Sequence, residues 1–427
     1  MRKALLRVFS TLTSKIEAFK PRENRKVKMF SCGPSVYRRP HIGNYRTFLY
    51  EDVLHRYLEY LGYDVLRLTS LTDIEDKAIS EAEKEGVSVR ELAERNRKTF
   101  SEDSELLRMR SPDYTACMLA CSSTAVEEAA KLVRTLLERD YAYYYKYEGR
   151  CNVYFDPLKF KDFGKLSKLN MNRWPEKKRR FHRDTYPGTP WNRGDFILWH
   201  GYKKGDADYW DTEIGKGRPA WNLQDAATIT KYLGSSIDIA CGGIDNLVRH
   251  HDYTIAIIEG ISRTEFAHYW FHGQHLFVDG KKMSKTKGNV YYPSDLVRMG
   301  YSGEHIRFFL IYGHYRKRLN FTLAKFREAR RKLDRFRDMT HELESAKSGK
   351  PSLEARNLAD DIIEAFEKGM NNDLNVNAAF DAVFKIVAKL HNLRESGRLG
   401  RSEALAAITN LRKVDYILQT IFSRGKA

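Results

Sequence analysis

The chain has 427 residues, of which 42% are hydrophobic, a content typical of globular proteins with two to four domains. We find no apolar run near the roughly 20 residues of a membrane span, and residues 1–6 do not begin a signal peptide. The net charge of +18 favours a polyanionic partner, and the five cysteines form no even-numbered disulfide framework, so we expect a cytoplasmic setting.

The first part of the chain alternates between strand-like and helical stretches. Residues 27–31 have the apolar character of a strand and end at Cys32, and residues 47–61 carry apolar side chains at helical spacing. Residues 65–69 have the pattern of the next strand. This order predicts a βαβ unit, and the turn after its first strand lies at the edge where open parallel sheets bind nucleotides.

Residues 110–215 break this alternation. They hold a helical stretch at 124–139, an aromatic-rich stretch at 141–155 and a basic loop near 170–190. We interpret them as an insertion that splits the nucleotide-binding fold, because the parallel pattern resumes at residues 237–240.

The C-terminal part is predicted to be almost entirely helical. From Phe321 onward the helical pattern is broken by one polar stretch, at 345–351. The predicted domains are 1–110 for the first half of an α/β, Rossmann-like catalytic domain, 111–215 for a connective insertion, 216–320 for the second half and 321–427 for a helical bundle.

Two short motifs indicate the chemistry, His41-Ile-Gly-Asn44 and Lys282-Met-Ser-Lys285. His41 and Asn44 can donate to phosphate oxygens, and Gly43 lets the backbone approach a nucleotide. Lys282 and Lys285 lie in a glycine-bounded loop that can close over a triphosphate. Such donors and cations stabilise the negative charge that develops when pyrophosphate leaves.

In this order and at this separation the motifs resemble the HIGH and KMSKS motifs of class I aminoacyl-tRNA synthetases. Asn44 stands where that family usually has a second histidine. The resemblance implies a class I synthetase fold and a reaction in which ATP, with Mg2+, and an amino-acid carboxylate give an aminoacyl-adenylate and pyrophosphate. His41, Asn44, Lys282 and Lys285 would be the catalytic residues.

A longer set of motifs, over roughly residues 6–420, resembles cysteinyl-tRNA synthetase. It is also similar to the mycothiol-pathway cysteine ligase, which joins cysteine to an amino sugar. In the family's order the motifs are Cys32-Gly-Pro-Ser-Val-Tyr37, Leu71-Thr-Asp-Ile-Glu-Asp-Lys77, Asp195-Phe-Ile-Leu-Trp199, Gly217-Arg-Pro-Ala-Trp221, Gly242-Gly-Ile-Asp245, His250-His251 and Gly313-His-Tyr-Arg316.

This resemblance assigns further residues. Gly242 and Gly243 would accept the adenosine, Asp245 would bind the ribose hydroxyls, and Thr72 and Trp221 would line the amino-acid pocket. From residue type alone, Thr72 can equally cap a helix, Trp221 can be a core aromatic and Asp245 a turn residue.

The chain departs from the family where the family grips cysteine with zinc. A thiolate binds Zn2+ well and a serine hydroxyl does not, so the metal discriminates between them. By position the ligands fall at Cys32, Asp225, His250 and Thr254, whereas the family has Cys at the second place and Glu at the fourth. His250 and Thr254 are one helical turn apart and can face one ion, but a neutral Thr is a poor ligand.

We therefore expect zinc to be lost, and thiol recognition with it. Asp225, with Cys32 and His250 in the same pocket, would then present a carboxylate suited to a hydroxyl, amide or cationic side chain. Two alternatives stay open. Cys32, Asp225 and His250 can still hold a metal, with Asp252 or Cys241 as a stand-in, or the chain is a working cysteine enzyme with tolerated changes.

The helical part contains a stretch typical of this family, Asn372-Asp-Leu-Asn-Val-Asn-Ala-Ala-Phe380. The residues that follow have the pattern of two helices, which we interpret as leaving no room for the family's anticodon-binding module. The acceptor of the activated amino acid therefore stays open. Positive charge, clustered at 177–183, 316–318 and 327–337, favours tRNA, and the missing module favours a small amine.

The prediction is an ATP-dependent ligase that adenylates an amino acid and transfers it to tRNA or to a small amine. Two alternatives are an authentic cysteine–tRNA ligase with a shortened C-terminus and a catalytically silent RNA-binding or regulatory relative. We expect no membrane partner, and the sequence does not decide between a monomer and a dimer.

Overall fold

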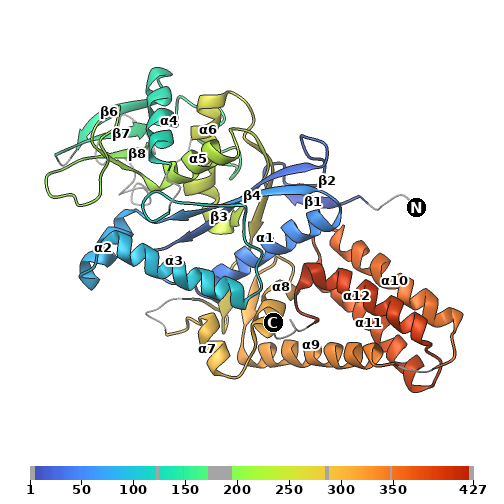
Figure 1. Cartoon of the computed structure of the whole chain (residues 1–427). Coiled ribbons are helices and arrows are strands. Elements are labelled where there is room, and N and C mark those ends of the chain that lie inside the picture. The colour runs from blue at the N-terminus through green and yellow to red at the C-terminus, as the bar shows by residue number, and fades with distance from the viewer. Residues whose placement is uncertain are drawn as a thin grey trace.

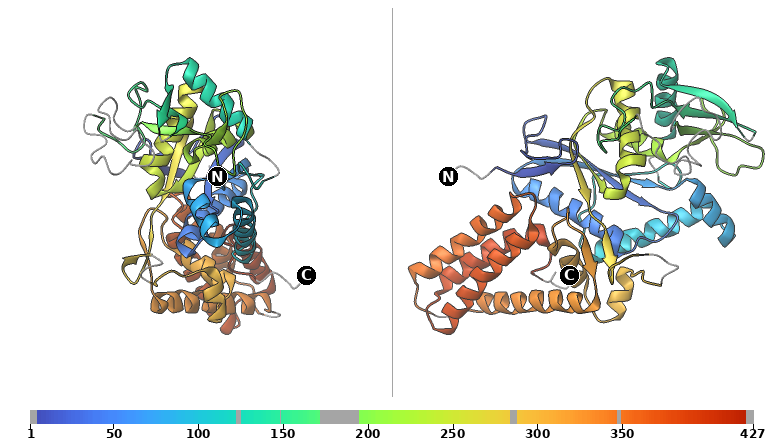
Figure 2. Two further views of the ribbon diagram at one scale, coloured as in Figure 1. Left: turned by 90° about the vertical axis from the view of Figure 1, so that its left-hand side faces the viewer. Right: turned by 180° about the vertical axis from the view of Figure 1, so that it is seen from behind.

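The computed structural model describes residues 5–121, 125–147, 149–171, 195–283, 288–346 and 349–422. A parallel sheet lies at the centre, with the inserted strands and helices on one side of it and the C-terminal helices on the other (Figure 1). The view from behind shows the same separation of the insertion from α10, α11 and α12 (Figure 2).

The central sheet has five parallel strands in the order β11-β10-β3-β4-β5. The chain runs outward from β3 in one direction and from β10 in the other, so the strand order reverses between these two neighbours. Such a reversal opens a crevice at the carboxyl ends of the strands, where open sheets bind ligands. The strands are β3 (Lys26–Ser35), β4 (Asp64–Thr72), β5 (Tyr114–Ala116), β10 (Ile237–Gly243) and β11 (Ala267–Gly273).

Both faces of the sheet are buried. Met29 and Ile239 pack toward α1, whereas their neighbours Phe30 and Ala240 pack toward the helices of the other face. This alternation follows from the two-residue repeat of a strand, so successive side chains of one strand enter different cores. The covering helices are α1 (Ile42–Tyr60) on one face and α4 (Val126–Glu138), α5 (Trp221–Tyr232) and α6 (Asp252–Ser262) on the other.

The first sequence predictions are confirmed, with longer elements. The strand expected at 27–31 is part of β3, and the helix expected at 47–61 is α1, which begins earlier because His41 caps it. The strand expected at 65–69 lies within β4. Two helices connect β4 to β5, α2 (Asp76–Glu85) and α3 (Val89–Leu106).

The region interpreted as an insertion contains an antiparallel sheet. The aromatic-rich stretch forms the hairpin of β6 (Ala142–Tyr147) and β7 (Arg150–Phe155). The sheet continues through β8 (Phe196–Gly201) to β9 (Gly217–Pro219). Most of the predicted basic loop, including Lys177–Arg180 and Arg183, lies outside the described residues.

Smaller elements join the part that contains the central sheet to the C-terminal helices. A short hairpin stands near the N-terminus, and a three-stranded sheet of order β13-β12-β14 carries the start of the second motif. These elements are β1 (Arg7–Ser10), β2 (Lys15–Ala18), β12 (Leu276–Val278), β13 (Lys281–Lys282), β14 (Leu319–Phe321), α7 (Pro293–Arg298) and α8 (Gly303–Tyr312).

The chain ends in four helices, α9 (Leu323–Glu344), α10 (Leu353–Met370), α11 (Val376–Glu395) and α12 (Arg401–Leu418). Thr322, Ser352 and Asn375 cap α9, α10 and α11 by accepting backbone N–H bonds. The predicted polar break falls between α9 and α10, as expected. None of the helices in the described ranges is long and apolar enough to cross a membrane.

One disulfide departs from the sequence analysis. Cys117 and Cys121, which follow β5, are bonded to each other. The sequence analysis expected no even-numbered disulfide framework and did not anticipate this pair, because a turn of four residues can bring two Cβ atoms together without a wider framework.

Candidate active site

A cavity of about 510 Å3 opens at the carboxyl ends of β3, β4 and β10. Most of the side chains predicted from sequence meet there. Two others, Asp225 and Gly242, lie behind its wall, and Lys285 falls outside the described residues. The predicted residues that line the cavity are Cys32, His41, Gly43, Asn44, Thr72, Trp221, Gly243, Asp245, His250 and Lys282.

His41 and Asn44 form a reciprocal cap at the start of α1. The backbone N–H of Asn44 donates to Nδ1 of His41 at 3.3 Å, and the N–H of His41 donates to Oδ1 of Asn44 at 3.0 Å. Because Nδ1 accepts, a neutral His41 carries its proton on Nε2, and burial lowers the pKa of His41. The residue is therefore a neutral donor, fixed in orientation by the helix that it caps.

Gly43 brings the two motifs together. A Cβ atom at Gly43 would lie 2.3 Å from the Cε atom of Met283, so a larger residue would displace the end of that side chain. Lys282 is exposed at the end of β13, and its carbonyl accepts from Asn289 at 3.3 Å across the loop. The two ends of the loop are thus tied to each other.

The turn after β10, which the sequence predicts to accept the adenosine, forms one side of the cavity. A Cβ atom at Gly242 would lie 2.5 Å from the ring of His251, and one at Gly243 would lie 2.6 Å from the carboxylate of Asp245. A side chain at Gly242 would displace the buried His251 ring, and one at Gly243 would displace the Asp245 carboxylate. Asp245 itself is exposed at the cavity, and the hydroxyl of Tyr50 donates to the Gly242 carbonyl at 2.9 Å.

The predicted amino-acid pocket is built around the imidazole of His250. Nε2 of His250 lies 2.6 Å from Oδ2 of Asp225 and 3.4 Å from Sγ of Cys32. The indole of Trp221 stacks on His250, with 4.6 Å between ring centroids and 12° between planes. Trp221 therefore holds the pocket in place as the first residue of α5, and is not simply a core aromatic.

Thr72 is buried at the end of β4 and lines the cavity. The following helix begins at Asp76 after Glu75, so Thr72 does not cap it. The hypothesis that Thr72 is only a cap is therefore wrong.

The predicted zinc positions do not all converge. The hydroxyl of Thr254 donates to the backbone carbonyl of His250 at 3.0 Å, so it turns along the helix and not toward the pocket. The expectation that it can face the same ion as His250 is contradicted by this bond.

The two suggested stand-ins also point elsewhere. Asp252 accepts the backbone N–H groups of Leu166 and Ser167, at 3.1 and 3.3 Å, and the Ser167 hydroxyl. Cys241 packs in the core beneath α1. The sequence could not exclude either residue, because the contacts that turn them away come from distant segments that sequence spacing does not reveal.

Three contacting residues were missed or given no role. Ser70, two positions before Thr72, donates to Oδ1 of Asp225 at 2.5 Å. Nδ2 of Asn246 donates to Sγ of Cys32 at 3.4 Å. His251 was part of a motif without an assigned function, yet its ligating atom lies within 4.8 Å of those of Cys32 and His250. Alternation along β4 could have indicated Ser70, which shares a strand face with Thr72.

Electrostatics in the pocket favour the protonated thiol when the protein side chains are considered alone. Burial, and then the negative charge of Asp225, raise the pKa of Cys32 well above its usual value. Burial, and then the neighbouring His272, lower the pKa of His251, which is therefore neutral near pH 7.

Comparison with known proteins identifies the family. The family model described as tRNA synthetases class I (C) catalytic domain matches residues 18–331. The chain is 35% identical over 415 residues to the cysteine–tRNA ligase of Chlamydia pneumoniae, covering 96% of this chain and 85% of that protein. It is also 35% identical over 421 residues to the cysteine–tRNA ligase of Koribacter versatilis, covering 97% and 82%.

Solved structures share the fold at low identity. The Mycobacterium tuberculosis methionyl-tRNA synthetase in complex with methionyl-adenylate has a TM-score of 0.66 at 15% identity, over 93% of this chain and 91% of that one. The Agrobacterium radiobacter K84 agnB2 LeuRS–tRNA–LeuAMS complex has a TM-score of 0.69 at 12% identity, over 94% and 85%. The family model and the curated relatives show that the chain belongs to the cysteinyl-tRNA synthetase family of class I and is a ligase of the aminoacyl-tRNA synthetase type.

Proposed function

We propose that this chain uses ATP and Mg2+ to adenylate an amino acid and passes the activated acyl group to tRNA or to a small amine. The observation that carries the proposal is the shared cavity. It joins His41 and Lys282 at one end to the buried Cys32–Asp225–His250 cluster at the other, across the Gly242–Gly243 turn.

The arrangement suits attack of a carboxylate oxygen on the α-phosphate of ATP. Pyrophosphate leaves with negative charge on its oxygens, and the Nε2–H of His41 and the ammonium of Lys282 face that region. Removing one preorganised donor of this kind costs about 100- to 1000-fold in rate in comparable sites. Asp245 would hold the ribose, and Asn44 has its Nδ2 left to donate while its Oδ1 caps α1.

The amino acid would place its side chain against Cys32, Asp225 and His250. Carried over by position, the family's zinc ligands are incomplete because Thr254 is bonded to its own helix. Zinc held by that set is therefore doubtful. The carboxylate of Asp225 would suit a polar or cationic substrate side chain. Each of its oxygens already has one hydrogen-bond partner in the protein, Ser70 for Oδ1 and His250 for Oδ2.

The second candidate is cysteine–tRNA ligase. It is favoured because the relatives named as cysteine–tRNA ligases match nearly the whole chain, and because Cys32, Asp225 and His250 still converge on one point. Each of the three residue types is one that binds zinc in other proteins.

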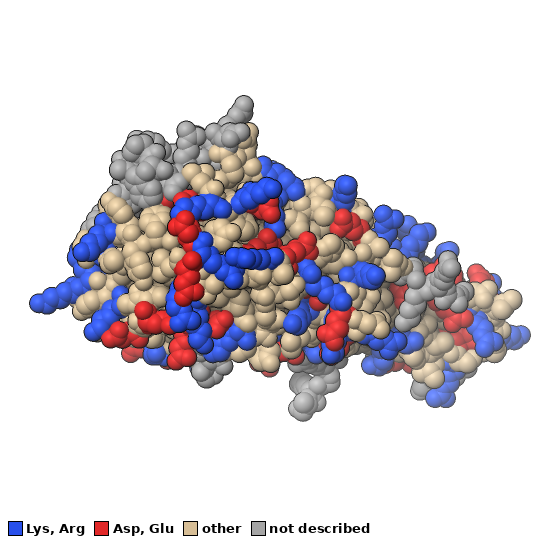
Figure 3. Space-filling model, turned by 90° about the horizontal axis from the view of Figure 1, so that it is seen from above, with Lys and Arg blue, Asp and Glu red and all other residues tan. Residues whose placement is uncertain are grey.

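The acceptor is proposed from charge. The net charge of +18 favours tRNA. Lys and Arg are spread between Asp and Glu over the face in Figure 3, so this face carries no single basic patch. A role in charging tRNA would place the protein in the cytoplasm with its substrate. A catalytically silent RNA-binding relative is disfavoured by an exposed Lys282 at the mouth of a complete cavity.

Adenylate formation can be tested directly by mass spectrometry. The protein is incubated with ATP, Mg2+, pyrophosphatase and one standard amino acid at a time, without tRNA, and the protein-bound products are analysed. The proposal predicts one aminoacyl-adenylate. An adenylate of cysteine supports the second candidate, whereas no adenylate with any amino acid, despite ATP binding, contradicts adenylation of a standard amino acid. Charging of total tRNA or of amines by the active amino acid then identifies the acceptor.

A further inference from the structure

A buried nitrogen next to the side-chain pocket has no protein partner. His251 is 1% exposed, its Nδ1 lies 2.8 Å from Nε2 of His272, and its Nε2 has no hydrogen-bond partner among the described residues. Burying such an atom without a partner is destabilising, so native structures usually provide one, often a water or an ion.

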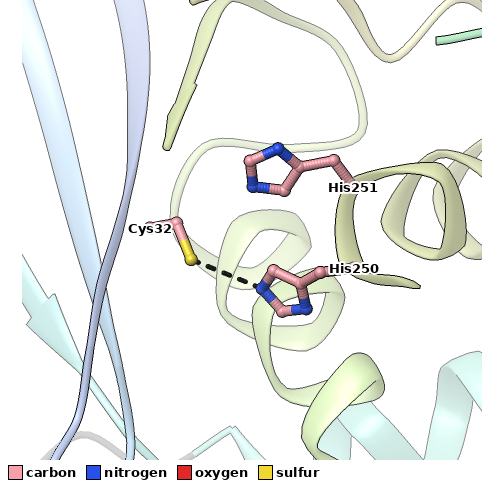
Figure 4. Close-up of side chains that lie close together, drawn as sticks. All are labelled: Cys32, His250 and His251. Atoms are coloured by element: carbon pink, nitrogen blue, oxygen red, sulfur yellow. Dashed lines mark hydrogen bonds between the residues drawn. The ribbon is translucent and has the colours of Figure 1, made fainter. Parts of the chain in front are cut away.

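That nitrogen belongs to a convergent group of donors. Figure 4 shows the rings of His250 and His251 both facing the sulfur of Cys32. One ligating atom from each of these three residues lies within 4.8 Å of the other two, and Oδ2 of Asp225 is 2.6 Å from Nε2 of His250. A thiolate and two imidazoles are donors that zinc binds well, and Asp225, which is not part of this group of three, bonds His250 beside it.

We propose that Cys32, His250 and His251 form a divalent metal site selective for zinc, in which His251 replaces the ligand that position 254 does not supply and Asp225 bonds His250 beside the ion. The donor set fits the ion although the positions differ from those of the family. The inference rests on the proposed function only in placing the metal beside the amino-acid pocket. Metal binding itself does not require that the chain adenylate anything.

The surroundings of His251 hold its ring in this orientation. Nδ1 of His251 is bonded to His272, and Nδ1 of His272 lies 2.8 Å from the hydroxyl of Thr11. Metal-binding histidines generally bond their second nitrogen in this way, which fixes the orientation of the first. This orientation of the ring also requires glycine at position 242, because a Cβ atom there would lie 2.5 Å from the His251 ring.

The competing explanation is that His251 belongs only to a buried hydrogen-bond chain with His272 and Thr11. A water would then satisfy Nε2, and the remaining Cys32, Asp225 and His250 would bind a metal equally well with or without His251. This explanation and the metal site therefore give different outcomes when His251 alone is changed.

Cobalt and zinc titration distinguishes them. The full chain is stripped with a chelator and titrated with Co2+, with absorption as the readout, and then with Zn2+ in competition. The proposal predicts one ion per chain with the strong visible bands of tetrahedral cobalt and a thiolate-to-cobalt band in the near ultraviolet. Cys32→Ser should remove the thiolate band, and His251→Gln should weaken zinc binding by at least about tenfold to a hundredfold.

Thr254→Val is the matched control, since it changes the adjacent turn at the family's fourth ligand position. It should leave the affinity for zinc unchanged. Circular dichroism melts show whether His251→Gln is folded, and His272→Gln, which keeps Cys32, His250 and His251, should weaken zinc binding less than His251→Gln does. No bound metal, equal affinity in wild type and His251→Gln, or loss of affinity in Thr254→Val would each overturn the site.

The same preparations separate this inference from the proposed function. If adenylation occurs and no metal binds, the metal site is wrong and the ligase stands. If the ion binds through His251 and no amino acid is adenylated, the metal site stands and the proposed function fails.

Discussion

The imidazole of His41 combines a structural and a chemical task. It caps α1 through Nδ1, and this bond leaves the Nε2–H to face the cavity as a donor. A short helix-start motif thus fixes the tautomer of a candidate catalytic group. The cap was not anticipated from sequence, because His is not among the usual N-cap residues.

Two substitutions of His41 separate these tasks. His41→Asn keeps an excellent cap and should change the free energy of unfolding by less than about 0.5 kcal/mol, whereas His41→Ala should lose about 1 kcal/mol. Both should slow adenylation by about 100-fold or more, because the donor at the phosphates is displaced or absent. Urea unfolding and single-turnover adenylate formation measure the two effects. Normal adenylation by His41→Asn would show that the imidazole is not a phosphate donor.

Glu51 is a buried carboxyl whose stability effect depends on pH. Burial raises its pKa from 4.5 to about 8, with Arg67 only partly offsetting the shift. Between these values the folded state holds one proton more than the unfolded state. The contribution of Glu51 to the free energy of unfolding is therefore highest below about pH 4.5 and falls as the pH rises to about 8.

The side chain of the isosteric variant Glu51→Gln cannot titrate. This variant should therefore not lose the stability that the wild type loses through Glu51 as the pH rises. We expect it to be more stable than the wild type at pH 8 by up to a few kcal/mol, at about 1.4 kcal/mol for each pKa unit, with the difference shrinking toward pH 5. Urea unfolding at several pH values checks the prediction. A difference that does not change with pH would show that Glu51 is not the titrating group.

At the scale of elements, α1 is buried along nearly its whole length because it lies between the sheet and the C-terminal helices. Its apolar spacing was readable from sequence. Its buried polar residues were not given a role, since Asp52 and Arg56 contact partners hundreds of positions away. Arg307 of α8 donates to Oδ2 of Asp52 at 2.6 Å and to the Leu418 carbonyl at 2.7 Å, and so joins α1, α8 and the end of α12.

Asp52→Asn should destabilise the protein by about 3–5 kcal/mol, because it leaves the charge of Arg307 buried without a counter-charge. Burial would raise the pKa of Asp52, but Arg307 and Arg56 outweigh it and hold the pKa at about 2. Glu344→Gln is a control, since its 2.6 Å pair with Arg412 is exposed and should be worth under about 1 kcal/mol. Similar losses in both variants would contradict this account.

The limits of the sequence analysis are also clearest at this scale. Helix and strand periodicity located β3, α1, β4 and the C-terminal helices, because these elements bury regular apolar faces. Helical spacing suggested that His250 and Thr254 can share an ion, but a threonine hydroxyl that bonds the carbonyl four residues back turns away. The Ser70–Asp225 contact and the approach of His251 to Cys32 depend on how strands and helices from distant segments pack, which spacing does not encode.

At the scale of the whole molecule, positive charge on α9 is the clearest surface for RNA within the described residues. Arg327, Arg331 and Arg335 are exposed and recur every four residues, so they lie on one face of the helix. If tRNA is the acceptor, replacing all three with Gln should weaken tRNA binding and reduce the slope of log affinity against log salt by about 2 to 3.

Filter binding of total tRNA at several salt concentrations provides the measurement. Replacing Lys161, Lys203 and Lys204 in the insertion with Gln removes the same charge elsewhere and serves as the control. An equal effect of both triple variants would mean that binding follows net charge alone and that α9 is no special surface.

The central claim is that the cavity between the two motifs forms an aminoacyl-adenylate. Amino-acid-dependent exchange of labelled pyrophosphate into ATP tests it most directly, without tRNA, on protein of measured zinc content. We predict exchange with one standard amino acid, a loss of about 100-fold or more in Lys282→Ala, and little change in Lys281→Ala, the exposed neighbour on the same strand. Absence of exchange with every amino acid, or full exchange by Lys282→Ala, would contradict the account.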